Sequence, residues 1–317
     1  MTTQSAELSL LGDREENQDR VKVVSAEGTT LLIAIDGMGG HANGARAAEL
    51  AVESIEKDFL AHTHPVFDPQ GFLHRAIGQA HASLVDLGSD VAMEQRPRAT
   101  CALCLLQDDA AYWAHVGDSR IYRLGAENPQ VTQLTRDHTA GISAEQNYLI
   151  RAIGMDTSLN VDSSVVTLNQ GDIFLLSSDG VHDFLPAEDL CRLIELHSDD
   201  YDVACREIVA AAKNAGSNDN LSCVLLRIDQ LGLENIEDLN ERLTRLPFPP
   251  ELYPVLKIDG YEVLAEMYAS ERSQLYRVKD LESGEELVMK TPSRNYCDDP
   301  ANIERFIMEE WIGIRVD

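Results

Sequence analysis

Basic side chains are scarce in this sequence. Its 317 residues contain 26 Lys and Arg against 54 Asp and Glu, which gives a formal net charge of −28 at pH 7. Nucleic acids and anionic membrane surfaces attract proteins that carry basic patches. The charge balance argues against both, and we expect no nucleic-acid partner and no membrane partner.

Long hydrophobic runs are also missing. A membrane-spanning helix needs about 18 or more consecutive apolar residues, and no window of the sequence approaches that length. The first residues do not show a basic stretch followed by an apolar core, so we expect no secretory signal. The hydrophobic fraction of 44% is typical of a globular protein with ample core.

The 6 cysteines do not form a disulfide framework. Cys101 and Cys104 have C-x-x-C spacing, but they lie inside the apolar segment 99–106, which predicts a strand. Side chains three positions apart on a strand point to opposite faces, which argues against a zinc site or a redox pair. Buried, reduced thiols are our interpretation, and they favour a cytoplasmic location.

The sequence does contain four aspartates that adjoin apolar, strand-like segments. Short apolar runs bounded by turn signals predict buried strands. Asp-Gly and Asn-Asp-Asn are also ordinary turn formers, but four such positions together favour a carboxylate cluster. Carboxylate oxygens are hard ligands that suit Mg²⁺ or Mn²⁺ better than zinc. The four are Asp36 after segment 30–35, Asp118 after segment 111–116, Asp179 after segment 173–177, and Asp219 before segment 221–226.

Around these aspartates the chain resembles the metal-dependent protein phosphatases, the PPM type or type 2C serine/threonine phosphatases. The resemblance extends over residues 8 to 228 and follows the order of the family's motifs. It implies hydrolysis of phosphoserine and phosphothreonine in proteins by a metal-activated water. The motifs are Gly12–Asp19, Asp36–His41, Gly117–Arg120, Leu134–His138, Arg151–Gly154, Ser177–Gly180 and Ser217–Asn220.

The expected fold is α+β. Helical spacing predicts helices over 43–60, 73–87 and 205–214, and strands dominate elsewhere, including a hairpin of 112–116 with 121–124. Strands in runs with helices segregated between them favour two packed antiparallel sheets flanked by helices. The resemblance implies the same four-layer α-β-β-α sandwich, with a metal site at one end.

The resemblance also implies a set of metal ligands. Two metal ions can activate a bridging water and hold phosphate oxygens. Asp36 would bridge two ions of Mn²⁺ or Mg²⁺, and the Gly37 carbonyl would bind one of them. Asp179 and Asp219 would complete the other ion's ligands. Asp19 would act through metal-bound water, and Asp118 with Asp179 would form a third, weaker site, so two or three ions are expected.

Arg14 is the candidate ligand of the substrate phosphate. Its planar guanidinium matches two phosphate oxygens, and it lies five residues before Asp19, as in the family. The alternative is a solvated arginine beside Glu15 and Glu16. His41 is a candidate general acid, although the eukaryotic members carry their histidine at the position of Met38. The alternative for His41 is a loop histidine that only stabilises the turn.

The segment between the motifs that end at His138 and begin at Arg151 is short. Most family members carry a longer flap there, with helical turns. Residues 139–150 are all that this chain has. A shorter flap implies a more open site with less substrate contact, and no proposed metal ligand falls within it.

We expect a phosphatase domain at 1–230, an acidic helix and Pro-rich linker at 231–256, and a further domain at 257–317. The last part resembles the incomplete start of a protein-kinase amino-terminal lobe, with strands 261–264, 275–278 and 287–290. Lys290 would match the phosphate-pairing lysine and Glu309 the helix glutamate. Its phosphate-loop glycines are replaced by Tyr268, Ser270 and Ser273, so no phosphorylation is expected. The alternative is a small β-rich appendage.

Two functions of different classes are compatible with these residues. The first is a protein serine/threonine phosphatase that acts on phosphorylated proteins, with a protein kinase as a further candidate partner. The second is a non-catalytic phosphoprotein-binding or docking module of the same fold. The presence of Asp19, Asp36, Asp179 and Asp219 favours the enzyme, because a module without turnover would be free to lose them.

Overall fold

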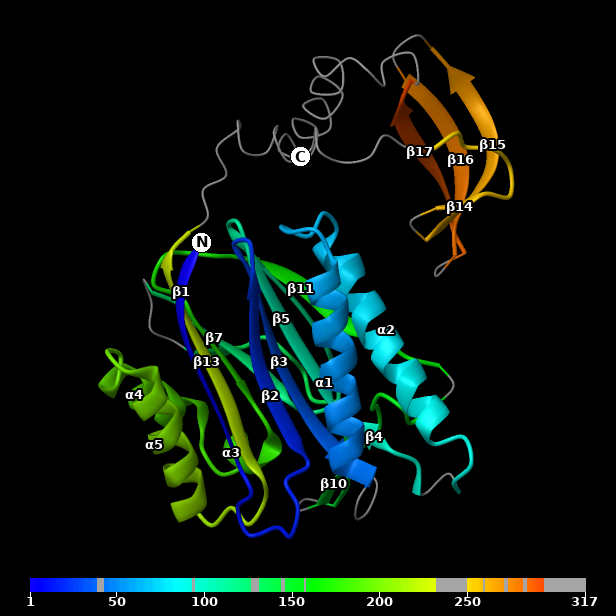
Figure 1. Ribbon diagram of the computed structural model, residues 1–317. Helices are drawn as coiled ribbons and strands as arrows, with labels where there is room; N and C mark the ends of the chain where they lie inside the picture. The colour runs from blue at the N-terminus through cyan, green and yellow to red at the C-terminus, as the bar shows by residue number, and fades with distance from the viewer. Residues whose placement is uncertain are drawn as a thin grey trace. The chain divides into compact units, whose positions relative to one another are not determined.

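Figure 1 shows the computed structural model of the chain, which falls into two compact units, Met1–Leu233 and Glu234–Asp317. Each unit is described by itself. The described residues are 1–38, 43–92, 95–126, 131–143, 146–156, 158–231, 250–258, 260–270, 273–281 and 284–293.

The first unit contains two large antiparallel sheets. The strand orders are β11-β6-β5-β3-β2, with β4 paired to β3, and β1-β13-β12-β7-β8. The strands of the first sheet are β2 (Asp19–Ala26), β3 (Thr29–Met38), β4 (Arg98–Ala99), β5 (Cys101–Gln107), β6 (Ala110–Val116) and β11 (Asp162–Thr167). Those of the second are β1 (Thr2–Leu10), β7 (Arg120–Leu124), β8 (Val131–Gln133), β12 (Ile173–Ser177) and β13 (Leu221–Gln230).

Helices cover the outer face of each sheet. α1 (Asn43–Ala61) and α2 (Pro69–Leu87) pack on the first sheet, and α3 (Asp179–His182), α4 (Ala187–Leu196) and α5 (Tyr201–Asn214) pack on the second. The predicted four-layer α-β-β-α sandwich of two antiparallel sheets flanked by helices is therefore confirmed.

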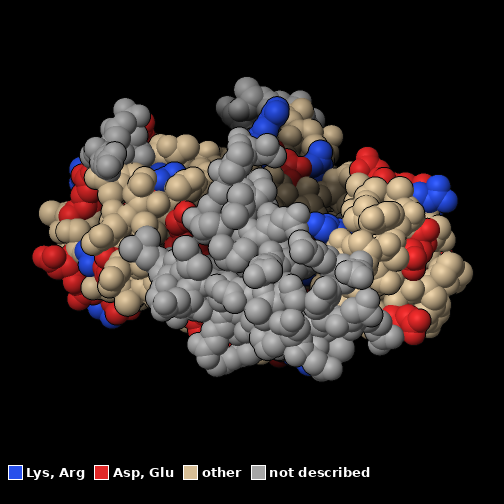
Figure 2. Space-filling model, turned by 90° about the horizontal axis from the view of Figure 1, so that it is seen from above, with Lys and Arg blue, Asp and Glu red and all other residues tan. Residues whose placement is uncertain are grey.

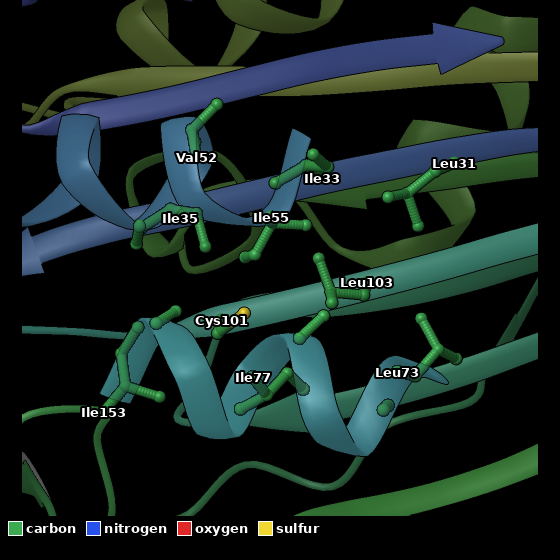
Figure 3. Packing of buried hydrophobic residues seen from close by; sticks show 14 of the residues in the cluster. Leu31, Ile33, Ile35, Val52, Ile55, Leu73, Ile77, Cys101, Leu103 and Ile153 are labelled. Carbon is green, nitrogen blue, oxygen red and sulfur yellow. The ribbon is translucent and has the colours of Figure 1, made fainter. Parts of the chain in front are cut away.

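The alternation of side chains along β3 explains the layers. Leu31, Ile33 and Ile35 point toward α1 and α2 and pack there with residues such as Ile55 (Figure 3). Leu32 and Ala34 belong instead to the core between the sheets, together with Phe174 and Val224 of the second sheet. Successive side chains of a strand point to opposite faces, so a strand covered on both faces is apolar throughout.

The predicted helix bodies are present, and two of them begin earlier than expected. α2 starts at Pro69, behind Asp68, whose carboxylate accepts a bond of 2.9 Å from the Gly71 amide. α5 starts at Tyr201, behind Asp200, whose carboxylate accepts a bond of 3.0 Å from the Val203 amide. These caps satisfy amide groups that lack partners in the first turn of a helix.

The predicted hairpin of 112–116 with 121–124 is wrong. β6 belongs to the first sheet and β7 to the second, so the chain crosses between sheets at Gly117. Gly117 has φ of +113°, and an added Cβ would lie 2.7 Å from the Thr100 side chain. The apolar faces of β6 and β7 are each buried by a different set of neighbours, and this burial overrides the local turn signal. Asp118 consequently stands where the two sheets meet.

The cysteine prediction is confirmed for Cys101 and Cys104. Both thiols are fully buried, Cys101 beneath the helices and Cys104 between the sheets, and burial raises the pKa of each. Neither is positioned to pair with the other.

The short flap is a two-stranded sheet of β9 (Thr139–Ser143) and β10 (Gln146–Leu149). None of the helices among the described residues is long and apolar enough to cross a membrane.

The second unit is a four-stranded antiparallel sheet around a small core. Its strands follow chain order as β14 (Lys257–Ile258), β15 (Tyr261–Ala269), β16 (Ser273–Asp280) and β17 (Glu286–Pro292). The three strands predicted at 261–264, 275–278 and 287–290 lie within β15, β16 and β17. Most of the predicted acidic helix and the position of Glu309 fall outside the described residues.

Acidic side chains lie at many points of the described surface. In the face shown in Figure 2 they are interspersed with Lys and Arg, in keeping with the net charge of −28.

Candidate active site

The predicted aspartates lie at one end of the two sheets. Asp19 and Asp36 face each other in register on β2 and β3. Asp118 follows β6 at the crossing between the sheets. Asp179 begins α3 directly after β12, and Asp219 lies just before β13.

The carboxyl groups at this end repel one another. Removal from bulk water, followed by the charges of Asp19, Asp179 and further carboxylates, raises the pKa of Asp36 well above its ordinary value. Burial, then Asp219 and other acids, raises the pKa of Asp179 to about 7. Burial and then Asp137 raise the pKa of Asp118 to about 6. Such an accumulation of negative charge favours a bound cation.

Hydrogen bonds from the second sheet hold Asp19. The Ser178 hydroxyl donates a bond of 2.7 Å to the Asp19 carboxylate, and the Ser222 amide donates one of 3.2 Å to the Ser178 hydroxyl. Asp19 is only 2% exposed. Burial raises its pKa, while the bond from Ser178 acts in the opposite direction. Residues of the second sheet thus fix the orientation of Asp19, which itself lies on the first.

The backbone around Asp36 is equally constrained. Its amide donates a bond of 2.9 Å to the Thr100 hydroxyl, and its carbonyl accepts one of 2.8 Å from the Thr100 amide. The Thr100 hydroxyl also lies 2.6 Å from that of Ser119. At Gly37 an added Cβ would overlap the carbonyl oxygen of Gly44, so the turn requires glycine there.

Arg14 reaches the same site from the loop after β1. Its Nη2 lies 2.5 Å from Oδ2 of Asp219, and the arginine side chain remains 55% exposed. An added Cβ at Gly12 would overlap the carbonyl oxygen of Asp219, which shows how closely this loop approaches. The ionic partner of Arg14 is therefore a proposed metal ligand, and the guanidinium is still open to a phosphate.

Sequence reasoning missed the residue that holds this loop. The amide group of Asn220 donates bonds of 2.8 and 3.1 Å to the carbonyls of Leu11 and Glu16. Its carbonyl oxygen accepts one of 2.8 Å from the Gln18 amide. The Asn-Asp-Asn pattern was the available signal, and it was interpreted only for its aspartate.

A second missed group surrounds Asp118. Arg120 binds Asp137 through both oxygens, with Nη2 to Oδ2 at 2.7 Å and Nε to Oδ1 at 3.0 Å. The Gly117 amide donates a bond of 3.1 Å to Nδ1 of His138, so that nitrogen is unprotonated. These contacts fix the crossing on which Asp118 stands. Their signal was the resemblance motifs 117–120 and 134–138, which were quoted without roles.

The donors are the right kind for Mg²⁺ or Mn²⁺, but they are not gathered around a point. Within the described ranges, no group of three or more His, Cys, Asp and Glu side chains has the arrangement of a metal site. The carboxylates are close enough to raise the pKa of Asp36 and of Asp179, but their oxygens do not surround a common point. Asp219 is paired with Arg14. A cation would have to draw the carboxylates together. His41 lies outside the described residues.

Comparison with known proteins supports the resemblance. The protein phosphatase PhpP of Streptococcus pneumoniae D39 is 28% identical over 247 residues, which cover 71% of this chain and 98% of PhpP. The serine/threonine phosphatase of S. agalactiae has a similar fold, with a TM-score of 0.66 at 22% identity over 72% of this chain and 100% of that one. The catalytic domain of PstP in complex with 2 manganese ions matches with a TM-score of 0.62 at 24% identity, over 71% and 97% of the two chains.

The profile of the family described as Protein phosphatase 2C matches residues 9–226. This match ends before the second unit, so the comparisons give no support to a kinase-like tail. It covers most of the chain and nearly all of the first unit, which confirms the prediction of a protein serine/threonine phosphatase. The chain belongs to the protein phosphatase 2C family.

Proposed function

We propose that this chain hydrolyses phosphoserine and phosphothreonine in proteins with Mn²⁺ or Mg²⁺ held by the aspartates at the end of the two sheets. The observation that carries the proposal is the gathering of buried carboxyl groups close to other negative charges at this end of the sheets. Removal from water and neighbouring negative charges raise the pKa of Asp36, of Asp179 to about 7, and of Asp118 to about 6. A stable fold retains such repulsion where a cation is needed.

Asp36, Asp179 and Asp219 would hold two ions, with the Gly37 carbonyl as a further ligand. Asp118 would contribute to a third ion, and Asp19 would orient the others through water. When bound, the ions supply a water of lowered pKa and hold the phosphate oxygens.

The other steps belong to side chains of the chain itself. Arg14 would leave Asp219, which the cations would then neutralise, and bind two oxygens of the substrate phosphate. Asn220 would keep the loop of Arg14 in place during this exchange through its bonds to Leu11 and Glu16. His41, if it faces the leaving oxygen, would donate the proton that this oxygen needs.

A second candidate function is a phosphoprotein-binding module without turnover. The absence of a converged metal arrangement among the described residues, together with the Arg14–Asp219 ion pair, is the observation that favours it. Such a module would bind phosphate at Arg14 with no dependence on Mn²⁺.

Hydrolysis of a phosphothreonine peptide and of an aryl phosphate, measured with Mn²⁺ and with a chelator, separates the two. We expect metal-dependent release of phosphate from both substrates. Peptide binding that persists in chelator, with no release of phosphate in Mn²⁺, would establish the module instead.

For the rest of the chain we propose the division into a phosphatase domain at 1–230, a linker at 231–256 and a kinase-lobe-like part at 257–317. Support comes from the three antiparallel strands β15–β17, with Lys290 on the third. Incubation with ATP and Mg²⁺ should give no phosphate transfer. Transfer that is abolished by Lys290→Met would show instead that the tail is a working nucleotide site.

We also propose a cytoplasmic location and a protein kinase as the partner that supplies the phosphorylated substrates. The buried, reduced thiols of Cys101 and Cys104 support the first. Labelling of intact cells with a membrane-impermeant reagent tests it.

A further inference from the structure

A groove runs along the outside of the second sheet, between β1 and α5. It has a volume of about 530 Å³, within the range of pockets that bind ligands. Its walls are mainly apolar, from Leu8 and Leu10 of β1, Val209 of α5 and Leu221 of β13. Leu10 is 45% exposed, so a ligand in the groove would cover apolar surface that now faces water.

Two cations border this apolar groove. Arg206 and Lys213 lie on α5, about two turns apart on one side of the helix. Lys213 is 2.5 Å from the exposed Asp13, whereas Arg206 has no ion-pair partner within the part of the chain that the structure describes. In a chain of net charge −28, such a pair beside an apolar groove is complementary to a ligand with apolar and acidic side chains.

The groove reaches the loop that carries Arg14. Gly12 lines the groove and also packs against the backbone of Asp219, which pairs with Arg14. Arg14 is two positions after Gly12, a span of at most about 7 Å. An extended peptide with its phosphate at Arg14 would therefore bring a side chain about two or three positions away into the groove.

The short flap leaves room for contacts elsewhere between the protein and the residues that flank the phosphorylated one. β9 and β10 form a hairpin of only a few residues next to the crossing at Gly117. A phosphatase that holds only the phosphate would accept any phosphorylated residue, so selectivity requires contacts with the flanking residues.

We propose that the groove between β1 and α5 binds the part of a phosphoprotein substrate that adjoins the phosphorylated residue, with preference for an apolar and an acidic side chain. The proposal rests on the phosphatase activity proposed above. The bound part of the substrate would be an extended segment with acidic and apolar side chains, not a folded domain.

Phosphothreonine peptides test the preference. One set carries Leu and Glu at the second and third positions on either side of phosphothreonine, and the matched set carries Ala and Lys. We expect the native chain to show kcat/KM about tenfold higher for the first set, because one buried apolar side chain and one ionic contact are gained. The side on which the effect appears gives the direction of the peptide.

Two variants on the exposed side of α5 test the groove itself. Ala210→Trp fills it and should lower kcat/KM for the Leu-Glu peptide about tenfold. Arg206→Glu should reverse the preference between Glu and Lys. Neither residue belongs to the proposed catalytic site, so hydrolysis of an aryl phosphate should stay within about twofold of the native rate. Lys57→Glu, on the exposed side of α1, is the matched control and should change neither substrate.

The outcomes are distinguishable. If the native chain does not hydrolyse the aryl phosphate in Mn²⁺, the proposed function fails and the groove proposal with it. If it hydrolyses all substrates but shows no preference, or if Ala210→Trp and Arg206→Glu keep the native ratio of peptide to aryl phosphate activity, the groove proposal alone is wrong. If the native chain is a dimer, Ala210→Trp makes it a monomer, and hydrolysis of the peptides is unchanged, the groove binds a second copy of the chain and the groove proposal is wrong.

Discussion

Two aspartates at opposite ends of the sandwich show how differently a fold can treat the same side chain. Asp172 precedes β12 and is fully buried, and its carboxylate accepts bonds from Arg123 at 2.5 Å, from the Ala126 amide at 3.0 Å and from the Asn169 amide at 2.9 Å. Asp36, toward the other end, faces the carboxylates of Asp19, Asp179, Asp118 and Asp219.

The difference separates a structural carboxylate from a functional one. The charge of Asp172 is compensated by one guanidinium and by amide donors, so it completes the fold without any ligand. The negative charge of Asp36 is repelled by the neighbouring carboxylates. This repulsion destabilises the metal-free fold, and only a bound cation would offset it. Position at a strand end, which is all that a sequence reveals, does not distinguish the two.

Removal of the unsatisfied carboxylate should have the largest effect on activity. Asp36→Asn keeps the shape of the side chain and removes the charge that would bridge the cations. We expect Mn²⁺-dependent hydrolysis to fall by about 10³-fold or more, with the far-ultraviolet circular dichroism unchanged. Activity within tenfold of the native chain would contradict the assignment of Asp36.

Removal of the satisfied carboxylate should act on stability instead. Asp172→Ala leaves Arg123 and two amides without their acceptor, and loss of one partner of a buried ion pair typically costs about 3–5 kcal/mol. Denaturant unfolding should show this loss in the free energy of unfolding, while activity per folded molecule stays close to native. Equal stability of the two chains would mean that Asp172 is not the structural counterpart described above.

Arg14 neutralises one carboxylate of the site, that of Asp219, in the way that Arg123 neutralises Asp172. Arg14→Ala should lower kcat/KM for phosphopeptides about 10- to 100-fold, the range for loss of charge-assisted bonds to phosphate. Arg14→Lys should restore little, because an ammonium lacks the planar fork. Affinity for Mn²⁺ should not fall. A collapse of metal affinity at constant KM would assign Arg14 a structural role.

The smallest expected effect is a gain in stability. Burial, then the charges of Asp219 and Asp118, raise the pKa of Asp179 from 3.8 to about 7. A carboxyl whose pKa is raised by folding contributes stability at low pH, and this contribution is lost as pH rises from about 4 through about 7. Without metal, Asp179→Asn should therefore raise Tm at pH 8 by about 4 °C, and the gain should shrink toward pH 4.

Thermal melts of both chains in chelator, at several pH values, measure this effect. With Mn²⁺ present the order should reverse, since the native carboxylate would then bind a cation. A gain of the same size at pH 4 and pH 8 would show that the charge of Asp179 is not its source.

The layers of the fold could be predicted from the sequence because they depend on local patterns. The apolar run of 30–35 specifies a strand buried on both faces, and the spacing over 43–60 specifies a helix. The crossing at Gly117 could not be predicted in this way. Whether a strand turns back or joins another sheet is decided by contacts such as that between Gly117 and Thr100, which are distant in sequence.

The site, like the fold, could be predicted from the sequence only in part. The aspartates could be found because they adjoin strand-like segments, but the residues that hold them in place could not. Ser178 binds Asp19 across 159 positions of sequence, and Asn220 binds Leu11 across 209. Nothing in the local sequence of either residue indicates its partner. Ser178 and Asp19 meet only when the two sheets pack, and Asn220 and Leu11 meet only when β1 pairs with β13.

Calorimetric titration of Mn²⁺ into the metal-free chain tests most directly whether the opposed carboxylates form a cation site. The chain should bind at least two ions near pH 6.5 and release protons, because cations displace protons from carboxyl groups of raised pKa. Buffers of different ionisation enthalpy measure that release. Asp36→Asn should lose the tight binding, and Asp172→Ala should keep it in the folded fraction. Equal binding by the native chain and Asp36→Asn, or no proton release, would contradict the account.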